Sequence, residues 1–321
     1  MPETLVELEK TDLTDKWYRN PAEFSRKKTL SEIGVFLLIT FGLMLTFGWK
    51  AYIMPGEDNG VVDPVNLNTG LKNFCYYIAA FSPALGCITA RYIFREGFRD
   101  DILFPKFTGH FKGYLLAFIL PLTWGIMNCI LITVVLGAGF TVKAPGGILE
   151  VVAALFQQSA IGYMAFFLLI GEELGWRAFL YDKLECLFGL NASIVIGGII
   201  WGVWHLPVLI QMGLNFGKDA PGFPITNVLL MCVFCVVIGA MLQMLRKMAD
   251  SVVAPIIAHA LIDTVCNVIA TMFLSEKIVD SVQFKIGGCM MVSSVLIGIP
   301  CWVYMNKCRH MRNGARQTLK K

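Results

Sequence analysis

Uninterrupted apolar runs of about twenty residues recur along this chain, and they constrain its fold more than any other feature. An α-helix of that length crosses the hydrocarbon core of a bilayer. In lipid only helices and closed barrels satisfy their own backbone hydrogen bonds, and a barrel strand needs only about ten alternating residues. The composition agrees, because 56% of the residues are hydrophobic and only 16% are charged. The sequence therefore predicts an all-α, polytopic membrane helix bundle.

Hydropathy along the chain predicts eight transmembrane helices. Together they form a membrane domain over residues 31–305, which follows a cytoplasmic N-terminal segment (1–30) and precedes a basic cytoplasmic tail (306–321). The predicted spans are 31–49, 72–93, 112–140, 147–171, 190–212, 224–245, 251–274 and 284–305.

The distribution of basic residues predicts how these spans are oriented. Alternate connections and both termini hold twenty-one of the Lys and Arg residues, and the opposite side holds six. Short cytoplasmic loops carry the excess of Lys and Arg in membrane proteins. We therefore expect a multi-pass protein of the plasma membrane with both termini in the cytoplasm.

A cluster of charged residues stands at the end of the fourth predicted span, in the sequence Gly-Glu-Glu-Leu-Gly-Trp-Arg that begins at Gly171. Glu173 and Arg177 are four residues apart, the spacing at which a carboxylate and a guanidinium meet on a helix. Glu172 points about 100° away from Glu173 and is left without a cation on its own helix. Gly171 and Gly175 let another helix approach closely.

Two further spans each carry one histidine. In the fifth span Trp201 and His205 share a helix face, and Pro207 predicts a bend directly after them. In the seventh span His259 and Asp263 are four residues apart and share a face as well. Ionisable side chains are costly at membrane depth and mark functional sites there. We therefore expect the three motifs to converge around one cavity that is open toward the cytoplasm.

These residue types suit hydrolysis by an activated water molecule. A carboxylate beside an imidazole can serve as a general base, and a second imidazole can stabilise an oxyanion. The chain contains no Ser-x-x-Lys, Gly-x-Ser-x-Gly or His-Glu-x-x-His motif. Two histidines and a carboxylate from separate helices could still bind zinc. We expect no cofactor, with a divalent metal such as zinc as the alternative.

The same residues resemble the motifs of the CPBP family of intramembrane proteases, which includes the type II CAAX prenyl endopeptidases and proteins of bacteriocin processing and immunity. Its Glu-Glu-x-x-x-Arg motif resembles Glu172–Arg177, and its aromatic-x-x-x-His motif resembles Trp201–His205. The third motif, His-x-x-x-Asn or Asp, resembles His259–Asp263. The family usually has phenylalanine where this chain has Trp201 and asparagine where it has Asp263. The likeness covers roughly residues 150–270.

The resemblance implies an intramembrane endopeptidase that hydrolyses a membrane-associated peptide, with prenylated or leader-bearing peptides as candidate substrates. It implies that Glu172 and His205 activate water, while His259 and Asp263 lie on the oxyanion side. The expected partners are the lipid bilayer and the peptide or protein substrate, and no nucleic acid. The alternatives are a secondary transporter that uses the same polar residues and a catalytically idle bacteriocin-immunity protein.

Overall fold

The computed structural model describes residues 25–53, 70–97, 103–137, 153, 169–273 and 283–319. Within these ranges the chain forms helices joined by turns and loops, with no strand, which confirms the all-α prediction. The described helices are α2 (Arg26–Leu43), the π-helix η2 (Met44–Gly48), α3 (Trp49–Ile53), α4 (Gly70–Ala80), α5 (Ser82–Ile93), α7 (Phe111–Leu136), the π-helix η4 (Trp176–Leu180), α9 (Tyr181–Phe188), α10 (Leu190–Trp204), α11 (Leu206–Met212), α12 (Ile225–Ala249), α13 (Val253–Phe273) and α14 (Gln283–Leu319).

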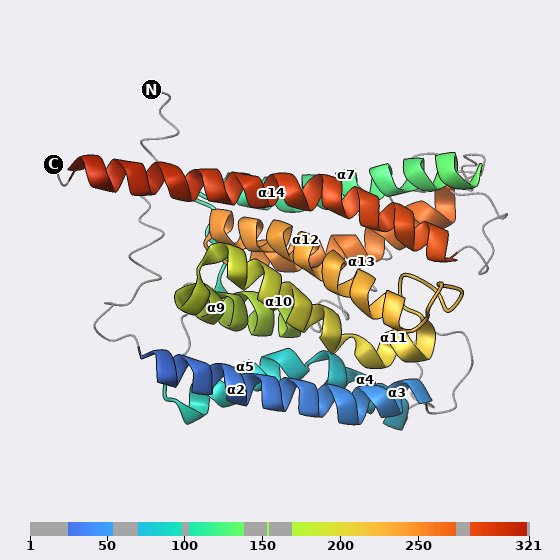
Figure 1. Cartoon of the computed structure of the whole chain (residues 1–321), viewed down its shortest axis with the longest axis horizontal. Helices are drawn as coiled ribbons and strands as arrows, with labels where there is room; N and C mark the ends of the chain where they lie inside the picture. The colour runs from blue at the N-terminus through green and yellow to red at the C-terminus, as the bar shows by residue number, and fades with distance from the viewer. Residues whose placement is uncertain are drawn as a thin grey trace.

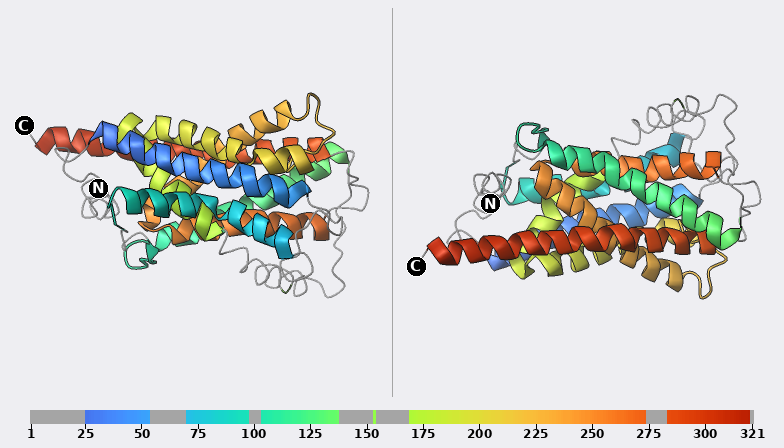
Figure 2. Two further views of the ribbon diagram at one scale, coloured as in Figure 1. Left: turned by 90° about the horizontal axis from the view of Figure 1, so that it is seen from below. Right: turned by 90° about the horizontal axis from the view of Figure 1, so that it is seen from above.

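The long helices lie roughly along one direction, with α14 along one side of the bundle and α2 along the other (Figure 1). Between them α10 packs on α12, α12 packs on α14, and α13 packs on α7. The helix pair α2 and α5 forms the opposite layer, as the two perpendicular views also show (Figure 2). The helices α10 and α13, which carry the second and third motifs, both pack against α12.

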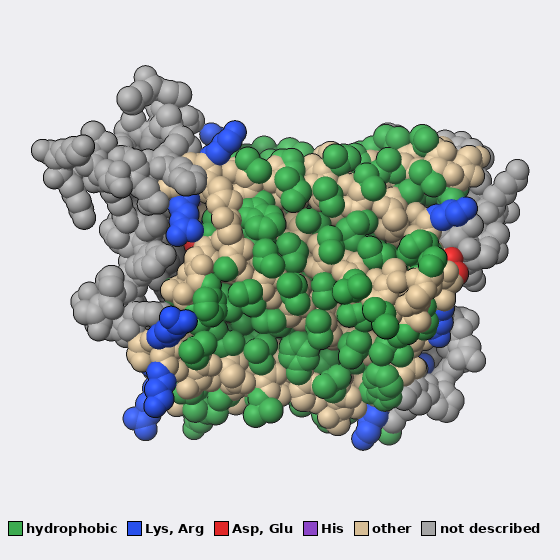
Figure 3. All heavy atoms as spheres, viewed as in Figure 1, with side chains coloured by type: hydrophobic (Ala, Val, Ile, Leu, Met, Phe, Trp, Pro, Cys, Tyr) green, Lys and Arg blue, Asp and Glu red, His purple; other side chains and the backbone are tan. Residues whose placement is uncertain are grey.

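The outer surface of the bundle suits a lipid environment. Hydrophobic side chains cover the middle of the face in Figure 3, and Lys and Arg side chains stand at its two ends. By length and composition, four described helices can cross a membrane, or five if the bent pair α10 and α11 counts as one span. The four are Arg26–Ala51, Phe111–Leu136, Ile225–Ala249 and Gln283–Arg309.

The count of eight spans and their orientation stay predictions. The second predicted span corresponds to two helices, α4 and α5, which meet at Phe81. The seventh corresponds to α13, and the fourth (147–171) lies almost entirely outside the described residues. The segment predicted as a basic tail continues α14 as far as Leu319, because a helix does not have to end where the apolar run ends.

Ion pairs join helices at the end of the bundle where α9 lies. The ammonium group of Lys183 on α9 contacts Glu32 on α2 at 2.5 Å and also contacts Glu96, which follows α5. Asp182, the preceding residue, accepts a hydrogen bond from Arg246 of α12 at 2.8 Å. Helix α9 is therefore fixed to three other parts of the fold by charge.

Glycines bring α10 and α12 into backbone contact. A Cβ atom at Gly198 would lie 2.5 Å from the Cα of Val236, and one at Gly202 would lie 2.6 Å from the Cα of Cys232. Small residues allow this approach between membrane helices and increase their van der Waals contact. The contact with α12 therefore fixes the position of the α10 face that carries the second motif.

We predict that Gly202→Val destabilises the protein, because the added side chain forces α10 away from the backbone of α12. The expected loss is about 1–3 kcal/mol, as for other overpacked interiors. Thermal unfolding in detergent measures it. Gly42→Val is the matched control, since nothing lies within 4 Å of a Cβ at that position. Equal melting temperatures for the two variants would contradict the proposed contact.

Candidate active site

The first motif lies on a short helical segment, residues 169–175, that continues into the π-helix η4. Its glycines meet the junction of α4 and α5: a Cβ at Gly171 would lie 2.5 Å from the ring of Phe81, and one at Gly175 would lie 2.4 Å from Pro83. This confirms the predicted close approach. The switch from α- to π-helix at Trp176 was not predicted, and such π segments are frequent at functional sites.

Glu173 joins two of the three motifs. Its Oε1 atom accepts a hydrogen bond from Arg177 Nη1 at 2.8 Å, which confirms the predicted pair. The same oxygen lies 2.8 Å from Nδ1 of His259 on α13. A carboxylate only accepts hydrogen bonds, so His259 donates from Nδ1. Arg177, Glu173 and His259 therefore form one buried triad, which we call the ion triad.

Aromatic rings cover the guanidinium group of Arg177. Its central carbon lies 4.1 Å from the ring centre of Trp201 and 5.3 Å from that of Tyr181. A cation over an aromatic ring is attracted to the partial negative charge of the ring face, and this attraction is strongest with tryptophan. Because Arg177 is fully buried, this contact and Glu173 are what compensate its lost hydration.

Glu172 is held separately from the ion triad. Its Oε2 atom accepts a hydrogen bond from the indole Nε1 of Trp201 at 3.0 Å. Its side chain is buried, with 8% of the residue surface exposed. The prediction that Glu172 and Glu173 have different partners is therefore confirmed, and the partner of Glu172 is the aromatic residue of the second motif.

His205 lies where the fifth predicted span breaks. It follows the last residue of α10 and precedes α11, and the two helices meet at 48°. Pro207 in the first turn of α11 confirms the predicted bend. The Nδ1 atom of His205 lies 2.9 Å from the carbonyl oxygen of Trp201. Since a carbonyl only accepts, Nδ1 carries the proton, and in the neutral ring Nε2 keeps its lone pair.

His259 and Asp263 share one face of α13, as predicted. The Nε2 atom of His259 lies 3.9 Å from Oδ2 of Asp263, which is longer than a hydrogen bond. His259 is buried, whereas 56% of the Asp263 side chain is exposed. Asp263 therefore lies at the border of the site, where its charge is partly hydrated.

Trp201 contacts four of the other six motif residues: Glu172, Arg177, His205 and His259. Its ring centre lies 5.9 Å from that of His205 and 5.4 Å from that of His259, the second pair edge to face. Its indole nitrogen binds Glu172, and its face carries Arg177. The three motifs thus converge as predicted. The water-holding cavity open to the cytoplasm that we expect between them stays a prediction.

Two features of the site were not predicted from the sequence. The hydrogen bond from His259 to Glu173 joins residues 86 positions apart, and neither residue alone indicates the other. Tyr76 of α4 lies near the carboxylates of Glu172 and Asp263. A tyrosine in an apolar run usually lies at a helix interface, so nothing in the sequence indicates this position.

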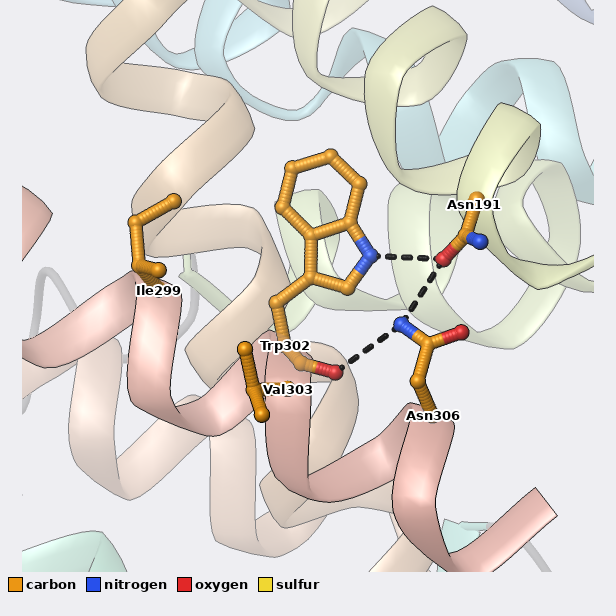
Figure 4. Close-up of a pocket in the computed structure, with 5 residues that line it drawn as sticks. All are labelled: Asn191, Ile299, Trp302, Val303 and Asn306. Atoms are coloured by element: carbon orange, nitrogen blue, oxygen red, sulfur yellow. Dashed lines mark hydrogen bonds between the residues drawn. The ribbon is translucent and has the colours of Figure 1, made fainter. Parts of the chain in front are cut away.

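The described residues contain no group of three or more His, Cys, Asp or Glu arranged to hold a metal ion. A groove of about 370 Å³ lies in the described part of the chain, between the first turn of α10 and α14. It is separate from the candidate site, because none of the seven motif residues lines it. There Asn191 accepts hydrogen bonds from Trp302 at 2.7 Å and from Asn306 at 2.9 Å (Figure 4). These bonds attach α14 to α10.

The fold and the site define a multi-pass helical membrane protein that holds a carboxylate–imidazole cluster inside its bundle. Residues 153–265 match the model of the type II CAAX prenyl endopeptidase Rce1-like family, which agrees with the resemblance seen in the sequence. The match contains all seven motif residues. A segment of 38 residues is 40% identical to CAAX prenyl protease 2 of Methanococcus maripaludis, and covers 12% of this chain and 14% of that relative.

We predict that Glu173→Gln lowers stability strongly, because it leaves the buried cation of Arg177 without its carboxylate. Breaking a buried ion pair costs about 3–5 kcal/mol. Arg177→Lys should also lower stability, since an ammonium group cannot lie flat on the Trp201 ring. Thermal unfolding in detergent measures both effects.

The matched control for this prediction is the pair of Lys28 and Glu32. They are 3.8 Å apart and the Lys28 side chain is 52% exposed, so Lys28→Gln should cost at most about 1 kcal/mol. A Glu173→Gln protein as stable as Lys28→Gln would show that the ion triad does not support the fold.

Proposed function

We propose that this protein is an intramembrane endopeptidase in which Glu172 and His205 activate a water molecule. The observation that supports this most directly is the position of Trp201. It holds the Glu172 carboxylate through its indole nitrogen and His205 through its backbone carbonyl. Two bases on different helices are thus positioned by one residue.

In the proposed reaction the water oxygen attacks the carbonyl carbon of the scissile peptide bond. One water proton passes to Glu172, with His205 Nε2 as the second acceptor, and the carbonyl oxygen becomes an oxyanion. The carbon–nitrogen bond then breaks, and the proton is delivered to the leaving amine. Both peptide products leave without a covalent bond to the enzyme.

His259 and Asp263 are proposed to act on the oxyanion side. Glu173 accepts from Nδ1 of His259, so the ring is fixed and Nε2 is the edge that faces outward from the ion triad. When Nε2 carries a proton, it can donate a hydrogen bond to an oxyanion. Asp263 stands on the same side at 3.9 Å and orients the imidazole.

The proposed substrate is a membrane-associated peptide, and a prenylated one in particular. The matching family and the archaeal relative are both described as CAAX prenyl proteases. A buried site in an apolar bundle also suits a peptide bond presented next to a lipid anchor. We propose that the site faces the cytoplasm in the plasma membrane, because the end of the bundle with α9 carries the larger share of the basic residues.

We predict that Glu172→Gln abolishes hydrolysis and leaves the fold intact, because it removes the general base but keeps an acceptor for the Trp201 indole. A rate loss on the order of 10²–10⁴ is expected for a missing general base. The assay uses purified protein with a farnesylated, C-terminally quenched peptide. Proteomics of membrane peptides from cells with wild-type and variant protein identifies natural substrates.

The control for this experiment is Glu185→Gln on α9, which removes a carboxylate that pairs with Lys247 away from the site. Its turnover should equal that of the wild type. Wild-type turnover in Glu172→Gln, with a normal melting temperature, would remove Glu172 from the mechanism.

We predict that turnover persists after divalent ions are removed, because a carboxylate and an imidazole can together deprotonate water. Metal content by mass spectrometry, and turnover before and after chelation, measure this. Stoichiometric zinc with turnover that chelation stops and zinc restores would instead show that the metal lowers the pKa of the attacking water.

A further inference from the structure

A second polar region lies behind the ion triad, between the segment that contains η4 and α9 and the helix α12. Five fully buried atoms there have no hydrogen-bond partner within the described part of the chain: Arg177 Nε and Nη2, Tyr181 Oη, and Gln243 Nε2 and Oε1. All three side chains are inaccessible to bulk solvent. None of the five atoms has a role in the proposed reaction.

The hydroxyl of Tyr181 and Nη2 of Arg177 both lie close to Gly239 of α12. A Cβ atom at Gly239 would lie 2.5 Å from Tyr181 Oη and 3.7 Å from Arg177 Nη2. The tyrosine ring is positioned from the other side, since a Cβ at Gly197 of α10 would lie 2.6 Å from it. The hydroxyl therefore points at the backbone of α12, where a side chain at position 239 would exclude it.

Gln243 extends this region along α12. It lies one helical turn after Gly239 and on the same face. Arg246 is three residues further on and binds Asp182, the neighbour of Tyr181, at 2.8 Å. Tyr181 and Asp182 thus contact α12 at Gly239 and at Arg246, and Gln243 occupies a position on α12 between these two contacts.

We propose that Arg177, Tyr181 and Gln243 enclose a buried water site. The guanidinium offers only donors, the hydroxyl offers a donor and an acceptor, and the amide offers both. A water molecule donates two hydrogen bonds and accepts two. It can therefore link the guanidinium, the hydroxyl and the amide, which make no direct hydrogen bonds to one another. Buried waters occupy sites of this kind, with about three hydrogen bonds each to buried polar groups.

The water site hydrates the side of Arg177 that Glu173 does not reach. Glu173 contacts Nη1, whereas Nε and Nη2 are the atoms without a protein partner. Water there holds the guanidinium in the orientation that lets Nη1 bind Glu173, and Glu173 in turn orients His259. Tyr181 and Gln243 are therefore positioning residues; this consequence, unlike the water itself, depends on the proposed function.

Radiolytic hydroxyl labelling of the purified protein in ¹⁸O-water detects the site without any substrate. Tyr181 should be labelled although it is buried, because the radical forms from water next to its ring. Trp124 is the control, a buried aromatic whose indole donates to Ser294 at 2.9 Å. Gly239→Ala should reduce labelling of Tyr181 to the level of Trp124, because its methyl group occupies the place of the hydroxyl.

Gln243→Met provides a second variant of similar shape in case Gly239→Ala does not fold. It should also reduce labelling, and its loss of melting temperature should not add to that of Tyr181→Phe, because both remove the same network. Unlabelled wild-type Tyr181, or fully additive losses, would overturn the water site.

Turnover of the farnesylated peptide tests the positioning role separately. Tyr181→Phe should lower kcat and leave KM unchanged, since the network orients His259 and does not contact substrate. An unchanged kcat would overturn the positioning role. Labelled Tyr181 in a wild-type protein that hydrolyses no peptide would support the water site and contradict the proposed function.

Discussion

A fully buried guanidinium is the constraint on which the rest of this structure depends. Arg177 can stay charged inside an apolar bundle only if a carboxylate, ring faces and hydrogen-bond acceptors surround it. Glu173 provides the carboxylate, and Trp201 and Tyr181 provide the rings. These residues come from three segments, so neutralising one charge fixes where α10 and η4 meet. His259 then joins the same carboxylate and adds α13 to the arrangement.

The sequence predicted the contacts that depend on spacing within one helix. The pair of Glu173 and Arg177, the bend at Pro207 and the close helix approach at Gly171 all follow from residue type and a period of 3.6. The site residues were found because ionisable groups are rare in apolar runs, so each one that occurs is conspicuous. The convergence of the three motifs was predicted from the same rarity.

The remaining features required the tertiary structure. The bond between Glu173 and His259 depends on how α13 approaches η4, and no local pattern records that approach. The π-helix at Trp176 is likewise recorded by no local pattern in the sequence. Helix ends are not predicted by hydropathy either, since α14 extends beyond the apolar run that indicates it.

Trp201 gives this chain a donor that a phenylalanine lacks. The family that this chain resembles usually has phenylalanine at this position. A phenylalanine ring can stack on an arginine but cannot donate a hydrogen bond to a carboxylate. Here the indole nitrogen holds Glu172 at 3.0 Å. The indole therefore adds a restraint on the proposed base and attaches its carboxylate to helix α10.

The ion pairs of Lys183 have a consequence for how the chain assembles. Glu32 is nearly inaccessible to solvent and lies on the first described helix, while its close cation is on α9, 151 residues later. Glu96 shares that cation. During synthesis both carboxylates exist before the lysine does, and a lone buried carboxylate is unfavourable. The first helices therefore reach their final packing only after the segment that carries Glu172, Glu173 and Lys183 has been made, which couples the order of synthesis to assembly of the candidate site.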